Sequence, residues 1–293
     1  MVGQQKWRKW GVVALFLLPN LGGMLLFSMV PVAASLGLTL FKWDLITPAQ
    51  FVGLANFRRL LTDADFWDAL GHTVYYLSGY VPLVSMAGLT LAILLNQKLR
   101  FQGFYRTAFF LPVVSSWVAV ALLWRWLFNP VTGPINFLLS LVGIQGPAWL
   151  YDANWAMPAI IATSVWKDAG YIAVLYLSGL QSIPNEYYEA SSIDGASAWQ
   201  RFRRITLPLL TPTTFFVVTI SLIGSFQVFD QVYIMTEGGP GGATTVLAER
   251  IFRNAFRYGR MGYAAAYSWM LFALVFVVTL IQHRFQRSWV HYE

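Results

Sequence analysis

Apolar residues dominate six long stretches of the chain, and polar residues are concentrated between them. These stretches lie near residues 11–40, 70–96, 104–127, 155–180, 207–234 and 262–282. An α-helix needs roughly 20 apolar residues to cross a bilayer, and each stretch comes near or exceeds that length. The pattern therefore predicts an all-α, polytopic membrane protein with six transmembrane helices, forming one domain over residues 1–293.

Composition supports a membrane protein and excludes several kinds of chemistry. The chain is 57% hydrophobic and only 11% charged, whereas soluble domains are about 25% charged. It has no cysteine, so disulfides, cysteine-ligated zinc and thiol nucleophiles are excluded. His72, His283 and His291 show no metal-ligand spacing, and we expect no metal site. The net charge of +7 is better explained by cytoplasmic loops than by nucleic-acid binding.

The distribution of Lys and Arg predicts the orientation of the chain. An even number of spans puts both termini on one side of the membrane, and basic residues favour that side. The clearest signal is the short loop at 97–106, which carries Lys98, Arg100 and Arg106. We therefore expect both termini in the cytoplasm. The first apolar stretch is too long for the core of a signal peptide, so we interpret it as a retained span.

A polar segment, residues 185–208, separates the fourth and fifth spans. It predicts two short helices joined by a sharp turn. Pro184 suits the first helical turn, Gly195 permits a positive φ, and Asp194 is expected to cap the second helix. A compact amphipathic pair tethered to the membrane at both ends is suited to dock in a groove of another protein.

The order of residues in this segment resembles the "EAA" loop of ABC-transporter permease subunits. The matching positions are Glu189-Ala190, Asp194-Gly195-Ala196, Phe202, Ile205 and Leu207-Pro208. Ser191 stands where the second alanine is usual. Residues 51–57, Phe-Val-Gly-Leu-Ala-Asn-Phe, resemble the "FVGLxNF" stretch in the first permease of sugar-permease pairs such as those for maltose and glycerol phosphate.

The resemblance implies the six-helix, MetI-like fold of type I ABC importer permeases in a bacterial or archaeal cytoplasmic membrane. It also implies a second permease, a pair of cytoplasmic ATPase subunits and an extracytoplasmic solute-binding protein. The chain has no G-x-x-x-x-G-K-[ST] phosphate-binding loop, so we expect that it is not itself an enzyme. ATP and Mg²⁺ are expected to bind to the partner ATPase subunits. In the coupling loop 181–206, the residues expected to contact the ATPase are Glu189, Ala190, Asp194, Gly195, Ala196, Arg201, Phe202, Arg203 and Arg204.

Ionisable residues inside spans are costly, which makes them functional candidates. The fourth span carries a polar stripe at helical spacing, and the fifth carries another. Such stripes line a cavity more plausibly than they face lipid. The sugar site of the maltose-transporter family falls on these two spans, which implies as substrate-binding residues Ser164, Lys167, Asp168, Tyr171, Ser221 and Ser225. Gln227 and Asp230, three residues apart on the fifth span, continue its polar stripe, and we expect them to bind substrate as well. A polar clamp between helices, without ligand contact, is the alternative for each of them.

The expected cargo is a sugar, an oligosaccharide or a related polyol. A phosphorylated polyol such as glycerol 3-phosphate is an alternative, with Lys167 as an anion donor that Asp168 and Asp230 partly offset. An ion-driven secondary transporter is less well supported, because the chain is short and shows no inverted repeat. An intramembrane enzyme would need a reactive pair, and the adjacent Lys167 and Asp168 do not face each other on a helix.

Four arginines near the last outer loop, Arg250, Arg253, Arg257 and Arg260, fall at helical spacing. This spacing predicts an amphipathic helix at the membrane surface. Its arginine face would lie among lipid headgroups or would dock a soluble partner.

Overall fold

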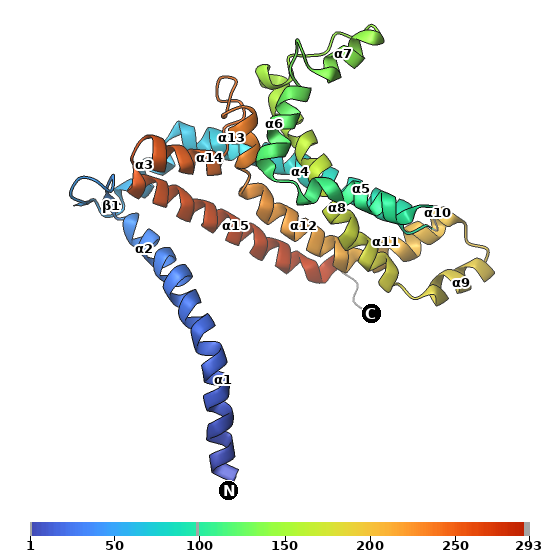
Figure 1. Cartoon of the computed structure of the whole chain (residues 1–293), viewed down its shortest axis with the longest axis horizontal. Helices are drawn as coiled ribbons and strands as arrows, with labels where there is room; N and C mark the ends of the chain where they lie inside the picture. The colour runs from blue at the N-terminus through green and yellow to red at the C-terminus, as the bar shows by residue number, and fades with distance from the viewer. Residues whose placement is uncertain (1, 98–99, 290–293) are drawn as a thin grey trace. The chain divides into compact units, whose positions relative to one another are not determined.

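The structure is a computed structural model that describes residues 2–97 and 100–289, with side chains over 12–97 and 100–286. Lys98 and His291 lie outside the described residues. The described chain is mostly helical with a single two-stranded sheet, which confirms the all-α prediction (Figure 1). Among the described residues, four helices are long and apolar enough to cross a membrane: Val12–Leu38, Ala64–Leu95, Ala153–Ser182 and Met261–Gln286. Two further bent helix pairs bring the number to six if each pair is one span.

The chain divides into two compact units, Met1–Asp63 with Ile251–Met270, and Ala64–Arg250 with Leu271–Glu293. The first unit contains α1 (Val2–Met24), η1 (Leu25–Met29), α2 (Val30–Leu38), β1 (Phe41–Lys42), β2 (Gln50–Phe51), α3 (Ala55–Thr62) and η4 (Arg253–Arg257). The helix α15 (Met261–Trp289) has residues in both units.

A small hairpin follows the first span. Strands β1 and β2 pair antiparallel, with Phe41 opposite Phe51. The backbone N–H of Met261 donates to the carbonyl of Trp43 at 2.9 Å, so the hairpin lies against the start of α15. A Cβ at Gly262 would collide with the carbonyl oxygen of Phe41, so this approach requires glycine.

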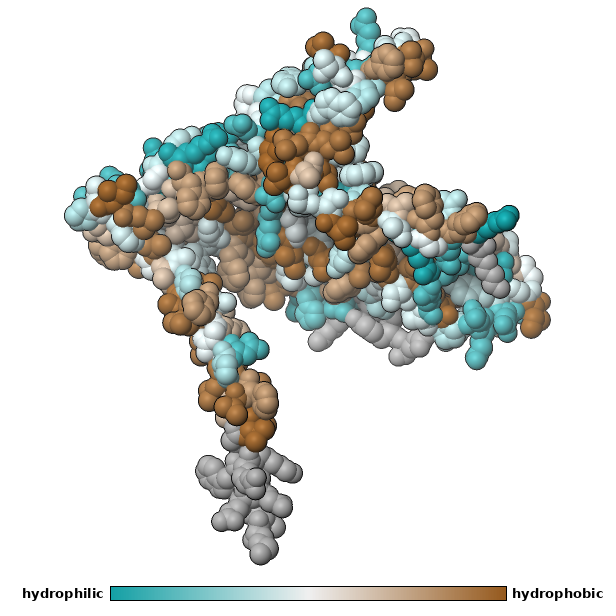
Figure 2. All heavy atoms as spheres, in the orientation of Figure 1, coloured by the Kyte–Doolittle hydropathy of each residue, from teal (hydrophilic) through white to brown (hydrophobic). Residues whose placement is uncertain are grey.

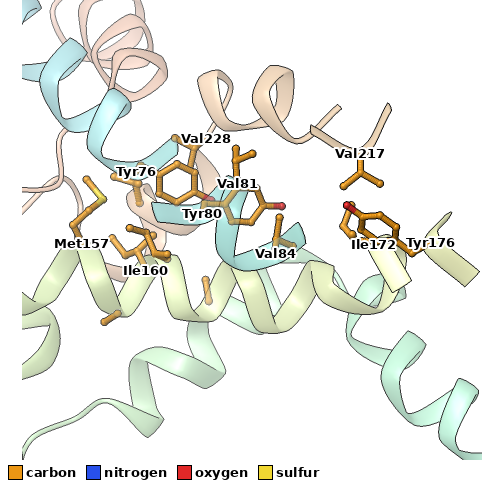
Figure 3. Packing of buried hydrophobic residues seen from close by; sticks show 14 of the residues in the cluster. Tyr76, Tyr80, Val81, Val84, Met157, Ile160, Ile172, Tyr176, Val217 and Val228 are labelled. Carbon is orange, nitrogen blue, oxygen red and sulfur yellow. The ribbon is translucent and has the colours of Figure 1, made fainter. Parts of the chain in front are cut away.

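The second unit is built on α8. Its elements are α4 (Ala64–Leu95), α5 (Gln102–Val114), α6 (Trp117–Leu127), α7 (Pro134–Leu141), η2 (Trp149–Tyr151), α8 (Ala153–Ser182), α9 (Asn185–Ile193), α10 (Ala198–Arg201), η3 (Phe202–Thr206), α11 (Leu207–Leu209), α12 (Thr211–Phe226), α13 (Asp230–Met235) and the first four residues of α14 (Leu247–Phe252), whose last two belong to the first unit. Helix α8 packs along α4 and also contacts α5, α12 and α13. Figure 3 shows the core between them, with Tyr76 and Val84 of α4, Met157 and Ile172 of α8, and Val217 of α12.

The predicted third span, 104–127, is not one continuous helix. Helices α5 and α6 meet at an angle of 99°. Ser115 and Ser116 adopt extended backbone, with ψ of 141° and 145°. The hydroxyl of Ser116 accepts from the N–H of Ala119 at 3.2 Å and caps α6. A side-chain cap therefore favours a new helix start here over continuation of the old helix.

The predicted fifth span, 207–234, is also divided. A bend of 62° separates Ala198–Leu209 from α12, and α12 ends at Phe226. The last turn tightens, because Gln227 N–H donates to the Gly224 carbonyl three residues earlier at 3.0 Å. Asp230 consequently lies on the separate helix α13, outside the span expected to hold it.

The expectation of one continuous arginine face is wrong. The side chain of Arg250 is only 16% exposed and pairs with Asp65 at 2.8 Å. The α-helix ends at Phe252 and continues as the π-turn η4, so the helical spacing on which the prediction rested is not kept. Arg257 and Arg260 are exposed.

Gly170 lets α5 approach α8. A Cβ at this position would collide with the carbonyl oxygen of Phe109 on α5, a backbone atom that cannot rotate away. We predict that Gly170→Ala forces the two helices apart and lowers the free energy of unfolding by about 1–3 kcal/mol. Thermal unfolding of the full chain in detergent measures this loss. The matched control is Gly224→Ala on α12, where a Cβ meets nothing within 4 Å. Equal unfolding midpoints for the two variants would contradict the prediction.

Candidate functional site

The polar segment between the long helices forms two short helices joined by a turn, and we call residues 185–206 the coupling hairpin. Helix α9 ends in a Schellman motif, in which Ala196 N–H donates to the Ser191 carbonyl at 2.9 Å and Gly195 N–H donates to the Ser192 carbonyl at 3.1 Å. Gly195 has a φ of 74°, which is the left-handed conformation that the sequence predicted.

The cap of the second helix differs from the prediction. Ser197, not Asp194, is the N-cap of α10. Its hydroxyl accepts from Gln200 N–H at 3.3 Å, and the Gln200 side chain accepts from Ser197 N–H at 2.7 Å. Asp194 instead ends α9, because the Schellman turn takes up the residues after it. The spacing Ser-x-x-Gln is a capping box that was visible in the sequence.

Two side-chain hydrogen bonds hold the limbs of the hairpin together. The Arg201 Nη1 donates to Ser192 Oγ at 2.9 Å, joining α10 to α9. The hydroxyls of Tyr188 and Thr206 lie 3.0 Å apart, joining α9 to η3. Neither Tyr188 nor Thr206 was singled out from the sequence. These bonds fix the geometry of the hairpin from within.

The residues predicted to contact an ATPase lie on this hairpin with unequal exposure. Six of them are exposed: Glu189, Ala190, Asp194, Gly195, Arg203 and Arg204. The other three are half-buried: Ala196, Arg201 and Phe202. Ile193 is 88% exposed and Trp199 is 66% exposed, although sequence reasoning named neither. A cleft of about 370 Å³ lies between the limbs, lined by Asp194, Gly195 and Arg204 among others. The hairpin thus presents apolar and charged groups together.

A polar cluster lies between α4 and α8. The Tyr80 hydroxyl donates to Asp168 Oδ2 at 2.8 Å. Its ring stacks on that of Tyr76 at 5.4 Å, and Gln231 Nε2 donates to the Tyr76 hydroxyl at 3.2 Å (Figure 3 labels both tyrosines). Of these residues, sequence reasoning found only Asp168, because an uncharged tyrosine in an apolar helix gives no signal of its own.

Lys167 has different partners from its neighbour Asp168. Its ammonium group donates to the Val113 carbonyl at 3.2 Å and lies 4.8 Å from the centre of the Trp117 ring. In a continuous helix the Val113 carbonyl would accept from the N–H of Trp117, but the chain breaks between them. Lys167 therefore satisfies a carbonyl that the break leaves free, at a depth where water is scarce.

The other predicted substrate residues fall into two groups. Ser164, Ser221 and Ser225 are at most 5% exposed, and the hydroxyls of Ser164 and Ser225 donate to carbonyls of their own helices at 2.8 and 2.6 Å. Tyr171, Gln227 and Asp230 are exposed. The exposed group is available to a ligand, while the buried serines shape the packing around it.

An aromatic series accompanies the exposed stripe of α8. Ring centroids are 5.1–5.5 Å apart along the series Trp166, Trp124, Phe128, Trp149 and Trp155. Trp155, Trp166 and Tyr171 are each 43–45% exposed. The sequence analysis named Tyr171 but did not single out Trp124, Phe128, Trp149 and Trp155, because their contacts join α6, η2 and α8. Exposed aromatic faces offer a surface on which a sugar ring can stack.

The described chain thus combines long apolar helices, polar side chains on them and a structured polar hairpin between two of them, which is the organisation of a multi-pass membrane protein. The chain belongs to the family described as binding-protein-dependent transport system inner membrane components, whose profile matches residues 84–291. This confirms the family that the coupling-hairpin motif indicated.

Two relatives and one solved structure illustrate the similarity. The chain is 40% identical over 279 residues to the probable ABC transporter permease protein YurN of Bacillus subtilis, covering 94% of this chain and 95% of YurN. It is 38% identical to the lactose transport system permease protein LacF of Rhizobium radiobacter, covering 92% and 91%. A chain of the bacterial alginate ABC transporter, solved with its alginate-bound periplasmic protein, superposes with a TM-score of 0.85 at 26% identity, covering 97% and 96%.

Tyr80→Phe removes the hydroxyl that donates to Asp168. Because Asp168 is half-buried between helices, we predict that loss of the donor lowers the free energy of unfolding by about 1–3 kcal/mol. Thermal or denaturant unfolding in detergent measures the change. The control is Tyr75→Phe on the same helix, where the side chain is 51% exposed. A Tyr80→Phe protein as stable as the control would show that the bond contributes nothing.

Proposed function

We propose that this chain is the membrane-spanning subunit of an importer for a sugar, an oligosaccharide or a related polyol, driven by ATP hydrolysis on partner subunits. The partners are a second, similar permease, a pair of cytoplasmic ATPase subunits that bind ATP and Mg²⁺, and an extracytoplasmic solute-binding protein. Both termini and the coupling hairpin lie on the cytoplasmic side. The family, and relatives such as the lactose permease, support this proposal.

The observation that carries the proposal is the construction of the coupling hairpin. Its turn, cap and cross-links are satisfied within the hairpin, yet Ile193 and Trp199 project from it. Exposed large apolar side chains in a polar surrounding mark a contact site for another protein. A preorganised element of this kind loses little conformational entropy on docking. It would pass the movement of an ATPase to the spans at its two ends.

Gly195→Pro tests the coupling. Proline requires a φ near −65° and has no N–H, so it can neither adopt the φ of 74° nor donate to Ser192. We predict membrane insertion and assembly with the partners, but loss of sugar-dependent transport. Radiolabelled sugar uptake, together with ATPase activity of the purified complex, measures this.

Gly143→Pro is the matched control for this variant. Gly143 also has a positive φ, 76°, and its N–H also donates to a carbonyl three residues earlier, but it follows α7. Proline at position 143 therefore imposes the same local strain, but at a site away from the coupling hairpin. Normal uptake by Gly195→Pro would contradict the role of the hairpin, and equal loss in both variants would attribute the effect to strain alone.

The proposed substrate path uses the predicted residues in two ways. Tyr171, Gln227 and Asp230 contact the cargo directly, because they are exposed, and Asp168 does so when oriented by Tyr80. Ser164, Lys167, Ser221 and Ser225 act through packing, because they are buried. A neutral cargo is favoured over a phosphorylated polyol, since the ammonium of Lys167 is already bound to Val113 and Trp117. An ion-driven secondary carrier receives no support from these features.

Tyr171→Ala removes an exposed ring and hydroxyl from the proposed path. We predict that the sugar concentration for half-maximal uptake rises about threefold to tenfold, the equivalent of roughly one neutral hydrogen bond. Uptake at graded concentrations measures this shift. Tyr75→Ala on α4, also exposed, is the control and should leave the value unchanged. An unchanged half-maximal concentration in Tyr171→Ala would remove this residue from the path.

A further inference from the structure

A cavity in the first unit has no role in the proposed transport function. It is an open pocket with a volume of about 580 Å³, lined by the β1–β2 hairpin, α3, residues 258–260 and the start of α15. We call it the hairpin pocket. Its floor is held by Asn56, which is buried and whose side-chain amide donates to the carbonyls of Thr39 and Phe41 at 2.8 and 3.0 Å. The backbone around the pocket is therefore fixed.

Three cations line the hairpin pocket, Lys42, Arg59 and Arg260. Within the described part of the chain, no carboxylate lies within ion-pair distance of any of them. The guanidinium of Arg59 lies over the Tyr263 ring at 4.5 Å, and that of Arg260 over the Tyr258 ring at 5.3 Å. The aromatic rings position both guanidinium groups without neutralising them.

One carboxylate, Asp44, also lines the pocket. Its Oδ1 accepts from the backbone N–H of Thr47 at 2.7 Å, from that of Ile46 at 2.9 Å and from the Thr47 hydroxyl at 2.9 Å. These bonds hold the pKa of Asp44 below its usual value, the N–H of Thr47 contributing most. The carboxylate therefore stays ionised and opposes an anion, but the three cations outweigh it.

The position of the pocket along the chain corresponds to the headgroup level of a membrane. Lys42 follows shortly after the end of the first span at Leu38, and Arg260 directly precedes the last span, which begins at Met261. Trp43 and Tyr258 also line the pocket, and such aromatic side chains favour the membrane–water interface.

Apolar side chains of the same segment are fully open to the surroundings. Ile46 is 90% exposed, Phe51 is 70% exposed and Leu54 is 68% exposed. Figure 2 shows hydrophobic and hydrophilic residues intermixed at this end of the unit, near the label β1 of Figure 1. A soluble anion would need only the cations. The exposed apolar rim is accounted for by acyl chains beside the bound group.

We propose that the hairpin pocket binds the phosphate of an anionic phospholipid headgroup, with Arg59, Arg260 and Lys42 as the contacting cations. Two guanidinium groups can donate paired hydrogen bonds to phosphate oxygens, and the lysine supplies a third charge. The acyl chains of the lipid lie along the exposed apolar residues of the β1–β2 hairpin and α3. A bound lipid would link the β1–β2 hairpin to the beginning of α15 at the membrane surface.

Native mass spectrometry of the full chain in detergent tests this, with phosphatidylglycerol, phosphatidylcholine and inorganic phosphate as probes. We expect phosphatidylglycerol to bind in preference to phosphatidylcholine. Arg59→Gln and Arg260→Gln should each weaken phosphatidylglycerol binding about fivefold, the usual effect of one cation near an anionic surface. Arg58→Gln is the matched control, because Arg58 is an exposed neighbour on α3 that does not line the pocket.

Asp44→Asn provides a gain-of-binding variant that misfolding cannot imitate. The asparagine oxygen can still accept the turn hydrogen bonds, but the opposing charge is gone, so phosphatidylglycerol binding should strengthen about fivefold. Parental affinity in the Arg59→Gln/Arg260→Gln double variant would overturn the proposal. Binding of inorganic phosphate without preference for the lipid would assign the pocket to a soluble anion instead. A double variant that keeps the lipid but loses a co-purifying solute-binding protein would assign it to protein docking.

Discussion

Helices α4 and α8 approach each other closely because glycines lie where they meet. A Cβ at Gly88 would collide with the side chain of Ile172, and a Cβ at Gly79 would come within 2.9 Å of Ile161. In a bilayer, burial from water does not drive helices together, so close van der Waals contact and hydrogen bonds between helices must hold them. The Tyr80–Asp168 bond lies on this same interface. Helices α5, α12 and α13 contact α8 as well.

The bend of the third span is stabilised because two backbone groups at the break have side-chain partners. At the α5–α6 break, the Ser116 hydroxyl accepts an N–H of α6, and the Lys167 ammonium donates to a carbonyl of α5. An unsatisfied carbonyl in hydrocarbon costs several kcal/mol. A lysine inside a span is therefore explained here by helix geometry, before any cargo is considered. A charged side chain within a span indicates a polar partner nearby, and this partner can be a backbone carbonyl of the protein itself and not a cargo.

The sequence predicted the helical class, the long apolar helices and the turn at Gly195, because these depend on local composition and conformation. It did not predict the breaks within two stretches, since a run such as 104–127 is predominantly apolar and the cap at Ser116 that interrupts it gives only a weak signal. Both Asp194 and Ser197 are good capping residues, so the sequence pattern alone did not distinguish them, and the prediction of Asp194 was wrong. The Schellman turn at the end of α9 is what makes Ser197 the N-cap. Tyr80, Tyr76 and the aromatic series were missed because their significance arises only from contacts between helices.

The π-turn η3 gives the coupling hairpin its particular relation to the membrane helices. It lies between α10 and α11, and its last residue, Thr206, is buried against Tyr188 of α9. A π-turn inserts one extra residue into a helix and is a point at which direction changes easily. The limbs of the hairpin are fixed to each other by Arg201 and Ser192, whereas the chain beyond η3 bends by 62° before α12. The bonds that hold the limbs of the hairpin together therefore end at Thr206, before the bend, and the direction of α12 is set beyond them.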